Sequence, residues 1–297
     1  MELHQLRYFT AVAQAGNFSR AAEKCHVSQP SLSQQIQKLE RWLKQPLFHR
    51  LGRKAVLTDA GRLLLDRATA ILADVDEAER RLRAGDDAER GRLAVGAIPT
   101  IAPYLLPPTL EAFSRRSPRA ELMVREDVTA ALLPALVEGE LDLALAALPI
   151  DDPHLEAEPL LTERLLLAVP AGHRLAGRRK AGIRDLAGER FILLGEMHCL
   201  GEQVVTFCRA NECQPFIACR SAQIGTIQQL IGLGQGISLL PELARQADVG
   251  GRVVYRRLAD PQPRRTIAIV RHRHHFHSPL ALAFIRELRS WAQHAKS

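Results

Sequence analysis

The amino-acid sequence predicts an α/β protein that begins with an all-α winged helix-turn-helix, continues through a long linker helix and ends in a larger α/β module. Three observations predict this. Helical spacing of apolar residues fills most of the first 45 positions, a long helical pattern follows Thr58, and strands alternate with helices from Arg92 onward. At 297 residues, 46% of them hydrophobic, the chain has room for two or three domains with cores of their own.

The net charge of +7 is concentrated at the N-terminal end of the chain. Residues 1–60 hold nine Lys and Arg against four acids, which is the electrostatic pattern of a nucleic-acid partner. No run approaches the ~18 apolar residues of a membrane span, and the N-terminus does not resemble a secretory signal. We therefore expect a cytoplasmic protein with no membrane partner.

The first sixty residues predict a DNA-binding domain. Apolar residues from Leu3 to Ala13 mark a first helix, Ser19 is the expected N-cap of a second helix that ends near Cys25, and Ser28 is the expected N-cap of a third. Leu32, Ile36, Leu39 and Leu43 form the apolar stripe of the third helix. Its other face is polar and rich in amides, so base-edge and phosphate contacts are expected from the following residues: Ser28, Gln29, Ser31, Ser33, Gln34, Gln37 and Lys38.

Two short strand patterns follow the third helix. Phe48–Arg50 and Lys54–Leu57 flank Leu51-Gly52-Arg53, and we interpret them as a wing with a basic tip, whose Arg50, Arg53 and Lys54 bind phosphates. A three-helix bundle with an incidental loop is the alternative, and the basic charge favours the wing.

Residues 61–90 are expected to form a linker. Thr58 is placed to cap a long helix, in which Leu64, Ala68, Ile71, Val75, Ala78 and Leu82 recur at alternating spacings of four and three. This heptad seam predicts self-association through a partner helix, although packing on the helix's own domain is an alternative. The polar segment 84–90 then predicts a hinge.

Residues 91–297 predict an effector-sensing module. Expected strands cover 93–97, 121–125, 141–148, 165–169, 191–194, 237–240 and 266–270, and expected helices cover 105–113, 130–137, about 200–210, 226–233 and 280–293. Ligands of such sheets bind beyond strand ends, where Thr100 and Thr129 offer hydroxyls near helix N-termini, although each could be a plain helix cap. The Gly232-x-Gly234-x-Gly236 spacing precedes a strand rather than opening a helix, so it does not indicate a dinucleotide site.

Several motifs resemble the LysR-type transcriptional regulators. They are Leu6-Arg7-Tyr8-Phe9, Phe18-Ser19-Arg20-Ala21-Ala22, Val27 to Ser33, Leu47-Phe48 and Leu57 to Gly61. The resemblance implies promoter DNA contacts by the third helix and the wing, dimers or dimers of dimers, an RNA polymerase partner and control by a small effector. It also implies a sensor of two similar subdomains, as in periplasmic binding proteins. The chain would pass from one subdomain to the other near residues 163 and 268, so that subdomain I covers about 91–163 and 268–297 and subdomain II covers about 164–267.

Cys199 and Cys208 stand out among five cysteines. On one regular helix they lie about 13 Å apart along the axis, whereas a disulfide needs Cα atoms within roughly 7 Å. Bond formation would therefore rebuild the segment, which is how a redox switch works. A helix start, the neighbouring His198 and a nearby Arg264 or Arg265 predict a low pKa for Cys199. The alternative is that the cysteines are small core residues.

Other motifs resemble the hydrogen-peroxide-sensing OxyR branch of the LysR family. They are Ile98-Pro99-Thr100, Pro103 to Pro107, His198-Cys199-Leu200, Gln203, Phe207-Cys208 and Pro263 to Thr266. The resemblance implies an activator in which Cys199 reacts with peroxide and Cys208 resolves it, while Thr100, Thr129, His198 and Arg265 bind the peroxide. Cys213 and Cys219 are additional and are candidate resolving thiols.

Two other functions remain open. One is a LysR-type regulator that binds a small organic anion between its subdomains, with Cys199 only lining the cleft. The other is a thiol peroxidase fused to a DNA-binding domain, which we disfavour because no nucleotide motif, Ser-His-Asp set or metal-ligand set is present. The histidines at 272, 274, 275 and 277 fit a solvated basic loop better than a metal site. We expect no enzymatic activity, no cofactor and no bound metal.

Overall fold

The computed structural model describes residues 1–51, 54–84, 91–248, 250–275 and 277–294. The chain divides into two compact units, and most of the first is residues 1–86. Each unit is described by itself. No helix among the described residues is long and apolar enough to cross a membrane.

The first unit starts with three helices, α1 (Leu3–Ala15), α2 (Phe18–Lys24) and α3 (Gln29–Leu43). Ser28 caps α3 as expected, because its hydroxyl accepts a hydrogen bond from the N–H of Ser31 at 3.3 Å. The expectation for α2 was wrong: the N-cap is Asn17, whose side-chain oxygen accepts from the N–H groups of Ser19 and Arg20. Asn is as good a cap as Ser, and the helix starts two residues earlier than the pattern suggested.

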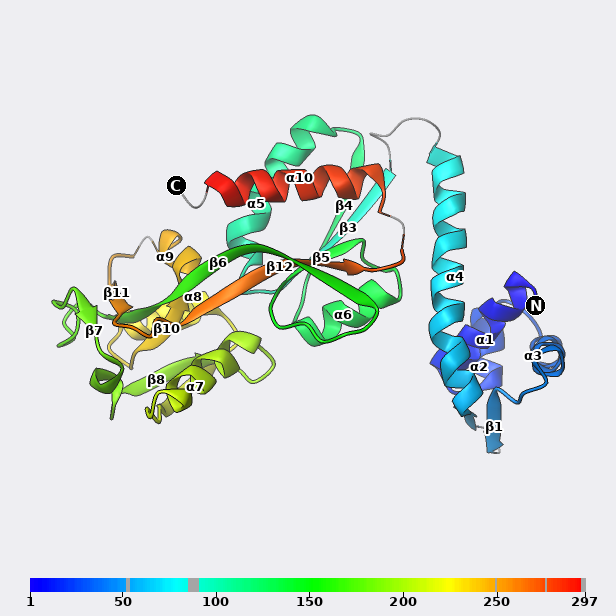
Figure 1. Ribbon diagram of the computed structural model, residues 1–297, viewed down its shortest axis with the longest axis horizontal. Helices are drawn as coiled ribbons and strands as arrows, with labels where there is room; N and C mark the ends of the chain where they lie inside the picture. The colour runs from blue at the N-terminus through cyan, green and yellow to red at the C-terminus, as the bar shows by residue number, and fades with distance from the viewer. Residues whose placement is uncertain (52–53, 85–90, 249, 276, 295–297) are drawn as a thin grey trace. The chain divides into compact units, whose positions relative to one another are not determined.

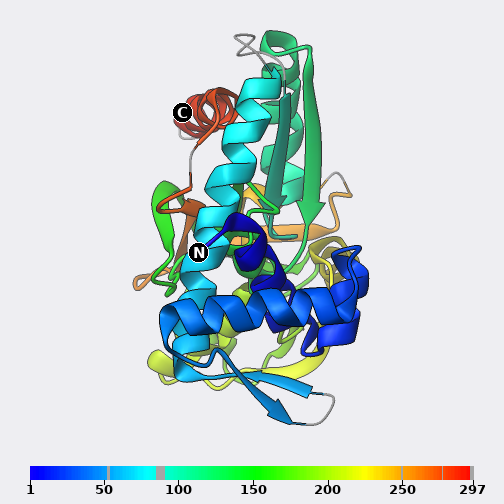
Figure 2. The same ribbon diagram turned by 90° about the vertical axis from the view of Figure 1, so that its right-hand side faces the viewer.

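Leu32, Ile36 and Leu39 of α3 are fully buried, which confirms the apolar stripe and fixes which face of α3 remains outside. A hairpin follows, formed by β1 (Phe48–Leu51) and β2 (Lys54–Leu57). In Figure 2 this hairpin, coloured mid-blue, extends away from the three helices. The helix-turn-helix and wing are therefore present.

The long helix α4 (Asp59–Ala84) begins at Thr58, whose hydroxyl accepts from the N–H of Gly61 at 3.0 Å. The heptad seam divides into two parts. Leu64 and Ala68 belong to the core of their own unit, whereas Ile71 is 37% exposed and Ala78 is exposed. The side chain of Leu82 lies outside the described residues. Packing on the same domain therefore accounts for the start of the seam, and an exposed apolar strip continues beyond it.

The second unit contains a mixed eight-stranded sheet. Seven strands follow the order β4 (Ala120–Glu126), β3 (Gly91–Ala97), β5 (Leu143–Ala147), β12 (Arg264–His272), β6 (Leu155–Pro170), β11 (Val253–Leu258) and β7 (Lys180–Ala181), and β10 (Ser238–Pro241) pairs with β6. Strands β6 and β12 run side by side through the middle of the unit (Figure 1). Their pairing contains a bulge, since Ile267 pairs with Leu161 and Ala268 with Pro159.

The two central strands divide this unit into two subdomains. On one side, α5 (Ala102–Arg116), α6 (Thr129–Val137) and α10 (Pro279–His294) accompany β3, β4 and β5. On the other side are α7 (Cys199–Ala210), α8 (Ile224–Gly232), α9 (Glu242–Gln246), the 3-10 turn Ile183–Leu186 and a small parallel sheet of β8 (Arg190–Leu194) and β9 (Phe216–Ser221). A two-subdomain α/β unit is confirmed.

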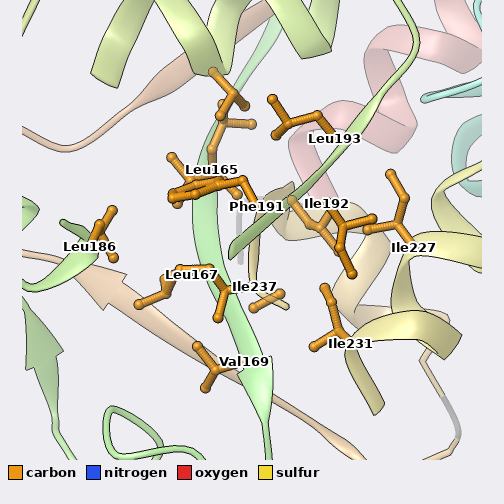
Figure 3. Close-up of a cluster of buried hydrophobic side chains, with 14 of the residues drawn as sticks. Leu165, Leu167, Val169, Leu186, Phe191, Ile192, Leu193, Ile227, Ile231 and Ile237 are labelled. Atoms are coloured by element: carbon orange, nitrogen blue, oxygen red, sulfur yellow. The ribbon is translucent and has the colours of Figure 1, made fainter. Parts of the chain in front are cut away.

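The core of the second subdomain is built around β6 and β8. Figure 3 shows Phe191 and Ile192 of β8 among the side chains of Leu165, Leu167, Ile227 and Ile237. Helix α7 joins the same cluster through Leu200, Val204 and Cys208. This packing holds α7 in place and so fixes both cysteines of the expected switch.

The sequence missed several elements of the second subdomain, namely β7, β9, β11 and α9. Each is short or has only a weak apolar period: in β9, for example, no residue is fully buried. The turn after α8 is as expected, since Gly234 has a φ of +79° and a side chain at Gly236 would meet the carbonyl oxygen of Arg190 at 2.4 Å.

Candidate functional site

A buried arginine lies at the junction of the two central strands. Arg265 on β12 is paired across the sheet with Glu163 on β6, and its Nε donates to Glu163 Oε1 at 2.8 Å. Its Nη1 donates to the Thr100 hydroxyl at 2.8 Å and its Nη2 to the Thr100 carbonyl at 3.0 Å. Both charged side chains are almost completely buried, so the ion pair and its hydrogen bonds hold the site rigidly.

Cys199 is the first residue of α7 and is half-buried. Gly201 allows this first turn to approach β8, because a side chain there would meet the carbonyl oxygen of Leu194 at 2.6 Å. The thiol is hydrogen-bonded to the side chain of Thr129, the first residue of α6, and it lies within the field of the Arg265 charge. The structure therefore brings Cys199, Thr129, Thr100 and Arg265 together from four separate segments.

Burial dominates the acidity of Cys199. It raises the pKa of the thiol above its ordinary value, while the charge of Arg265, the hydrogen bond with Thr129 and the backbone N–H groups at the start of α7 lower it in part. The low pKa expected from the sequence is therefore wrong for this fold, because the sequence does not show how deeply a helix start is buried. The thiolate, once formed, has a cation and hydrogen-bond donors around it.

Cys208 lies in the last turn of the same helix and is completely buried in the core. Burial, followed by the neighbouring Cys213, raises the pKa of Cys208 to about 12. All five cysteines are free thiols. Since α7 is helical from residue 199 to 210, the axial separation of about 13 Å applies, and the two sulfurs cannot bond in this fold.

Other side chains complete the site. The side-chain N–H of Gln203 on α7 donates to the carbonyl of Leu148 at 3.2 Å, while its buried Oε1 accepts no hydrogen bond within the part of the chain that the structure describes. Tyr104 packs against the core of the second subdomain, and burial raises its pKa, while the nearby charge of Arg265 lowers it in part. His198 is the N-cap residue of α7, but its imidazole makes no cap hydrogen bond.

Glu163 is the main functional residue that sequence reasoning missed. It is 6% exposed, and besides Arg265 it holds the N–H of Leu243 at 3.0 Å through Oε2. A carboxylate next to a run of apolar strand residues was the available signal, because a buried acid needs a partner.

The exposed face of α3 carries the expected DNA-contact residues. Gln29, Ser31, Gln34, Gln37 and Lys38 are exposed, and Ser33 is half-buried. Lys54 is exposed on β2, whereas Arg53 and the side chain of Arg50 lie outside the described residues. The hydroxyl of Ser28 is used in capping α3.

Among the described residues there is no group of three or more His, Cys, Asp or Glu side chains that could hold a metal ion. The rings of His154 and His272 stack on each other, with centroids 6.2 Å apart.

A helix-turn-helix with a wing, followed by an α/β unit of two subdomains, defines a DNA-binding regulator with a sensing domain. Residues 3–62 match the model of the bacterial regulatory helix-turn-helix proteins of the lysR family, and residues 86–293 match the LysR substrate binding domain. The chain belongs to the LysR family of transcriptional regulators, whose members bind promoter DNA and oligomerise.

The relatives found within that family include OxyR proteins. The chain is 37% identical over 274 residues to the DNA-binding transcriptional dual regulator OxyR of Escherichia coli, covering 91% of this chain and 89% of the relative. Full-length OxyR of Pseudomonas aeruginosa with a Cys-to-Asp substitution superposes with a TM-score of 0.72 at 31% identity, covering 97% of this chain and 98% of that chain. A cysteine mutant of Corynebacterium glutamicum OxyR with hydrogen peroxide bound gives a TM-score of 0.62 at 30% identity, covering 99% and 96%. These matches confirm the OxyR-like resemblance.

Proposed function

We propose that this chain is a promoter-binding activator switched on by hydrogen peroxide through a reversible Cys199–Cys208 disulfide. One observation carries the proposal: Cys199 starts α7 beside Thr129 and Arg265, while Cys208 is buried at the other end of the same helix. Relatives with 36–37% identity are named hydrogen peroxide-inducible genes activators, which supports it.

The chemistry follows from the site. The Cys199 thiolate attacks one peroxide oxygen, the O–O bond breaks, and the leaving hydroxide takes a proton and becomes water. Arg265, Thr129 and Thr100 hold the peroxide and the charge that moves onto its leaving oxygen, and Gln203 Oε1 is free to accept a hydrogen bond from it. Cys199 is left as a sulfenic acid.

The second step couples chemistry to shape. The Cys208 thiolate displaces hydroxide from the Cys199 sulfenic acid, a second water forms, and the sulfur–sulfur bond closes. Because α7 cannot stay helical across that bond, its core contacts and the Gln203–Leu148 hydrogen bond must break. The rearranged sensor then alters how the DNA-binding units engage the promoter.

The test uses the full-length protein and a small excess of hydrogen peroxide. Trypsin leaves Cys199 and Cys208 on one peptide, Phe191–Arg209, so the disulfide lowers the mass of that peptide by two hydrogens. We expect this product together with a change in promoter binding, and we expect Cys199→Ser to abolish both while the exposed Cys219→Ser leaves them intact. No such product, combined with unchanged promoter binding, contradicts the proposal.

The small organic anion is the second candidate effector, and the buried cation Arg265 is the observation in its favour. However, Glu163 already neutralises that cation at 2.7 Å. If Cys199→Ser responds to oxidant like the parent, the switch at Cys199 is ruled out; if an organic anion alone shifts promoter binding, the anion is the effector.

DNA recognition rests on α3 and the wing. Gln34→Ala and Gln37→Ala remove exposed amides able to read base edges, so each should weaken operator binding by about 1–3 kcal/mol with little change in nonspecific binding. Lys54→Ala should weaken operator binding and nonspecific binding equally and reduce the salt dependence, which is the signature of a phosphate contact. Fluorescence anisotropy across a salt series distinguishes base-edge contacts from phosphate contacts. Equal losses of operator binding and nonspecific binding in Gln34→Ala contradict a base-reading role for Gln34.

The remaining features of the function are part of the same proposal. The exposed strip on α4, with Ile71 and Ala78, supports a dimer, and a dimer of dimers that contacts RNA polymerase fits the family. Because its target is promoter DNA, the protein is placed in the cytoplasm and acts as a regulator rather than an enzyme.

A further inference from the structure

Cys208 has a second thiol beside it. Helix α7 ends in a Schellman motif: Glu212 has a left-handed φ of +57°, its N–H donates to the carbonyl of Arg209 at 3.2 Å, and the N–H of Cys213 donates to the carbonyl of Cys208 at 2.9 Å. In this motif the side chains at the positions of Cys208 and Cys213 pack on each other. Here both are buried in the same core, and their thiols are hydrogen-bonded.

The Cys208–Cys213 pair differs from the Cys199–Cys208 pair in what a disulfide would demand. The 2.9 Å backbone hydrogen bond and the hydrogen bond between the thiols already hold residues 208 and 213 close together, and a disulfide needs such proximity. A Cys208–Cys213 disulfide joins the last turn of α7 to a residue beyond the end of the helix, so α7 can remain helical from Cys199 to Arg209. An oxidised form with the fold of the reduced protein is therefore available.

We propose that Cys213 is an attenuating thiol, which takes Cys208 out of the Cys199–Cys208 disulfide and returns the sensor to its resting fold. The inference rests on the proposed function, because it starts from the disulfide that peroxide creates. The Cys213 thiolate attacks Sγ of Cys208, the Cys208–Cys213 bond forms, and the Cys199–Cys208 bond breaks. The electron pair leaves on the Cys199 sulfur, which takes up the proton that Cys213 lost.

The exchange consumes no further oxidant. One hydrogen peroxide has become two waters, Cys208 and Cys213 have lost two hydrogens between them, and Cys199 is a thiol again. The direction follows from packing: the Cys199–Cys208 form keeps α7 unwound and disrupts the packing of Leu200 and Val204, whereas the Cys208–Cys213 form restores it. Arg265 and Thr129 also stabilise the departing Cys199 thiolate.

The consequence is a sensor that is oxidised but no longer responds to peroxide. With Cys208 held by Cys213, a new sulfenic acid on Cys199 cannot be resolved by Cys208, so a second pulse of peroxide does not form the Cys199–Cys208 disulfide. A dithiol reductant would be needed to restore sensitivity.

The sequence makes the two disulfides distinguishable. Trypsin places Cys199 and Cys208 on Phe191–Arg209, and Cys213 and Cys219 on Ala210–Arg220. Full-length protein is treated with hydrogen peroxide, quenched with N-ethylmaleimide at intervals, digested without reduction and analysed by mass spectrometry. The internal link on Phe191–Arg209 should appear first and decline while a bridge between the two peptides grows.

Four variants assign the bridge. Cys219→Ser should behave like the parent, which shows that the bridge uses Cys213. Cys213→Ser should retain the internal link, and its promoter-active state should last several-fold longer. Cys199→Ser should form no bridge at the same peroxide concentration, because the oxidising equivalent enters at Cys199. Cys213→Ala repeats the measurement with an apolar side chain, and circular dichroism checks that this variant is folded. The time course of the parent protein tests the exchange without any substitution.

The outcomes separate this inference from the proposed function. An internal link that forms and never converts to a bridge overturns the role of Cys213 and leaves the peroxide switch standing. A bridge that forms in Cys199→Ser at the rate of the parent overturns the exchange route. If peroxide produces neither link, the peroxide switch fails and the attenuation fails with it.

Discussion

The two ends of α7 carry the same kind of residue in opposite surroundings. At the N-terminal end, Cys199 is half-buried and has a hydroxyl, a guanidinium and backbone N–H groups around it. At the C-terminal end, Cys208 is fully buried in the apolar cluster of the second subdomain, and its polar neighbour is another thiol. Residue type alone therefore decides neither reactivity nor role.

The difference shows how one helix can separate two steps of a reaction. Oxidant meets the thiol that has charge-stabilising neighbours, while the second thiol is kept from reacting until the helix opens. The free energy of packing α7 thus sets when the second step occurs. Four measurements test this contrast.

The largest expected effect is the difference in labelling rate between the two ends. At pH 8 a thiol with a pKa of about 12 is ionised in only about one molecule in 10⁴, and Cys208 is also inaccessible. Iodoacetamide should therefore label Cys199 long before Cys208, with the exposed Cys219 as the reference for an unprotected thiol. Tandem mass spectrometry of Phe191–Arg209 locates the label; equal labelling of both sites contradicts the contrast.

Arg265→Ala should have the next largest effect, because it leaves Glu163 buried without its cation. We expect a loss of about 3–5 kcal/mol in the free energy of unfolding, measured by urea denaturation, and slower oxidation of Cys199. The matched control is Arg289→Ala, which breaks the exposed Arg289–Glu158 pair and should cost at most about 1 kcal/mol. Similar losses for the two variants would show that the buried pair is not special.

Leu200→Ala should weaken the packing that keeps α7 closed. We expect about 2–5 kcal/mol of destabilisation together with faster disulfide closure once the Cys199 sulfenic acid has formed. Leu186→Ala removes an equally buried leucine of the same core that is not on α7, so it should destabilise without speeding closure. Stopped-flow quenching gives the closure rate, and acceleration in both variants would mean that global stability is the controlling factor.

Thr129→Val should have the smallest effect. The Thr129 hydrogen bond lowers the pKa of Cys199, so its removal should raise that pKa further and reduce the thiolate present at neutral pH. A hydrogen bond to a charged group contributes about 1.5 kcal/mol or more, which corresponds to roughly tenfold slower alkylation. The deficit should vanish once the pH exceeds the pKa of the thiol in the variant, and Thr129→Ser should restore the rate. A pH-independent deficit points to a packing role instead.

The sequence predicted the parts of the fold that have strong periodicity. The helix carrying both cysteines, the stripe of α3 and the strand at residues 143–147 appear where expected. It did not predict β9, in which no residue is fully buried, nor the cap at Asn17, since several residues near a helix start are suitable caps.

The candidate site was predicted in its members but not in its energetics. Cys199, Thr129, Thr100 and Arg265 come together, yet the partner Glu163 was missed because it lies about a hundred residues away from Arg265 in sequence and meets it only through strand pairing. The raised pKa of Cys199 depends on burial, which local sequence does not show. The contact between Cys208 and Cys213 depends on a left-handed residue at Glu212, where glycine is the usual signal.

The bulge in the central strand pair, β6 and β12, bends the strands that run between the two subdomains. Leu160 is the extra residue on β6, lying between Pro159 and Leu161, so the strand bends and twists there more than a regular ladder would. Because β6 stays paired with β12 on both sides of Leu160, the extra residue is taken up locally, and removing it would leave the pairing intact while making the strand straighter. The bend at this point of the central strand pair thus depends on a single extra residue in β6.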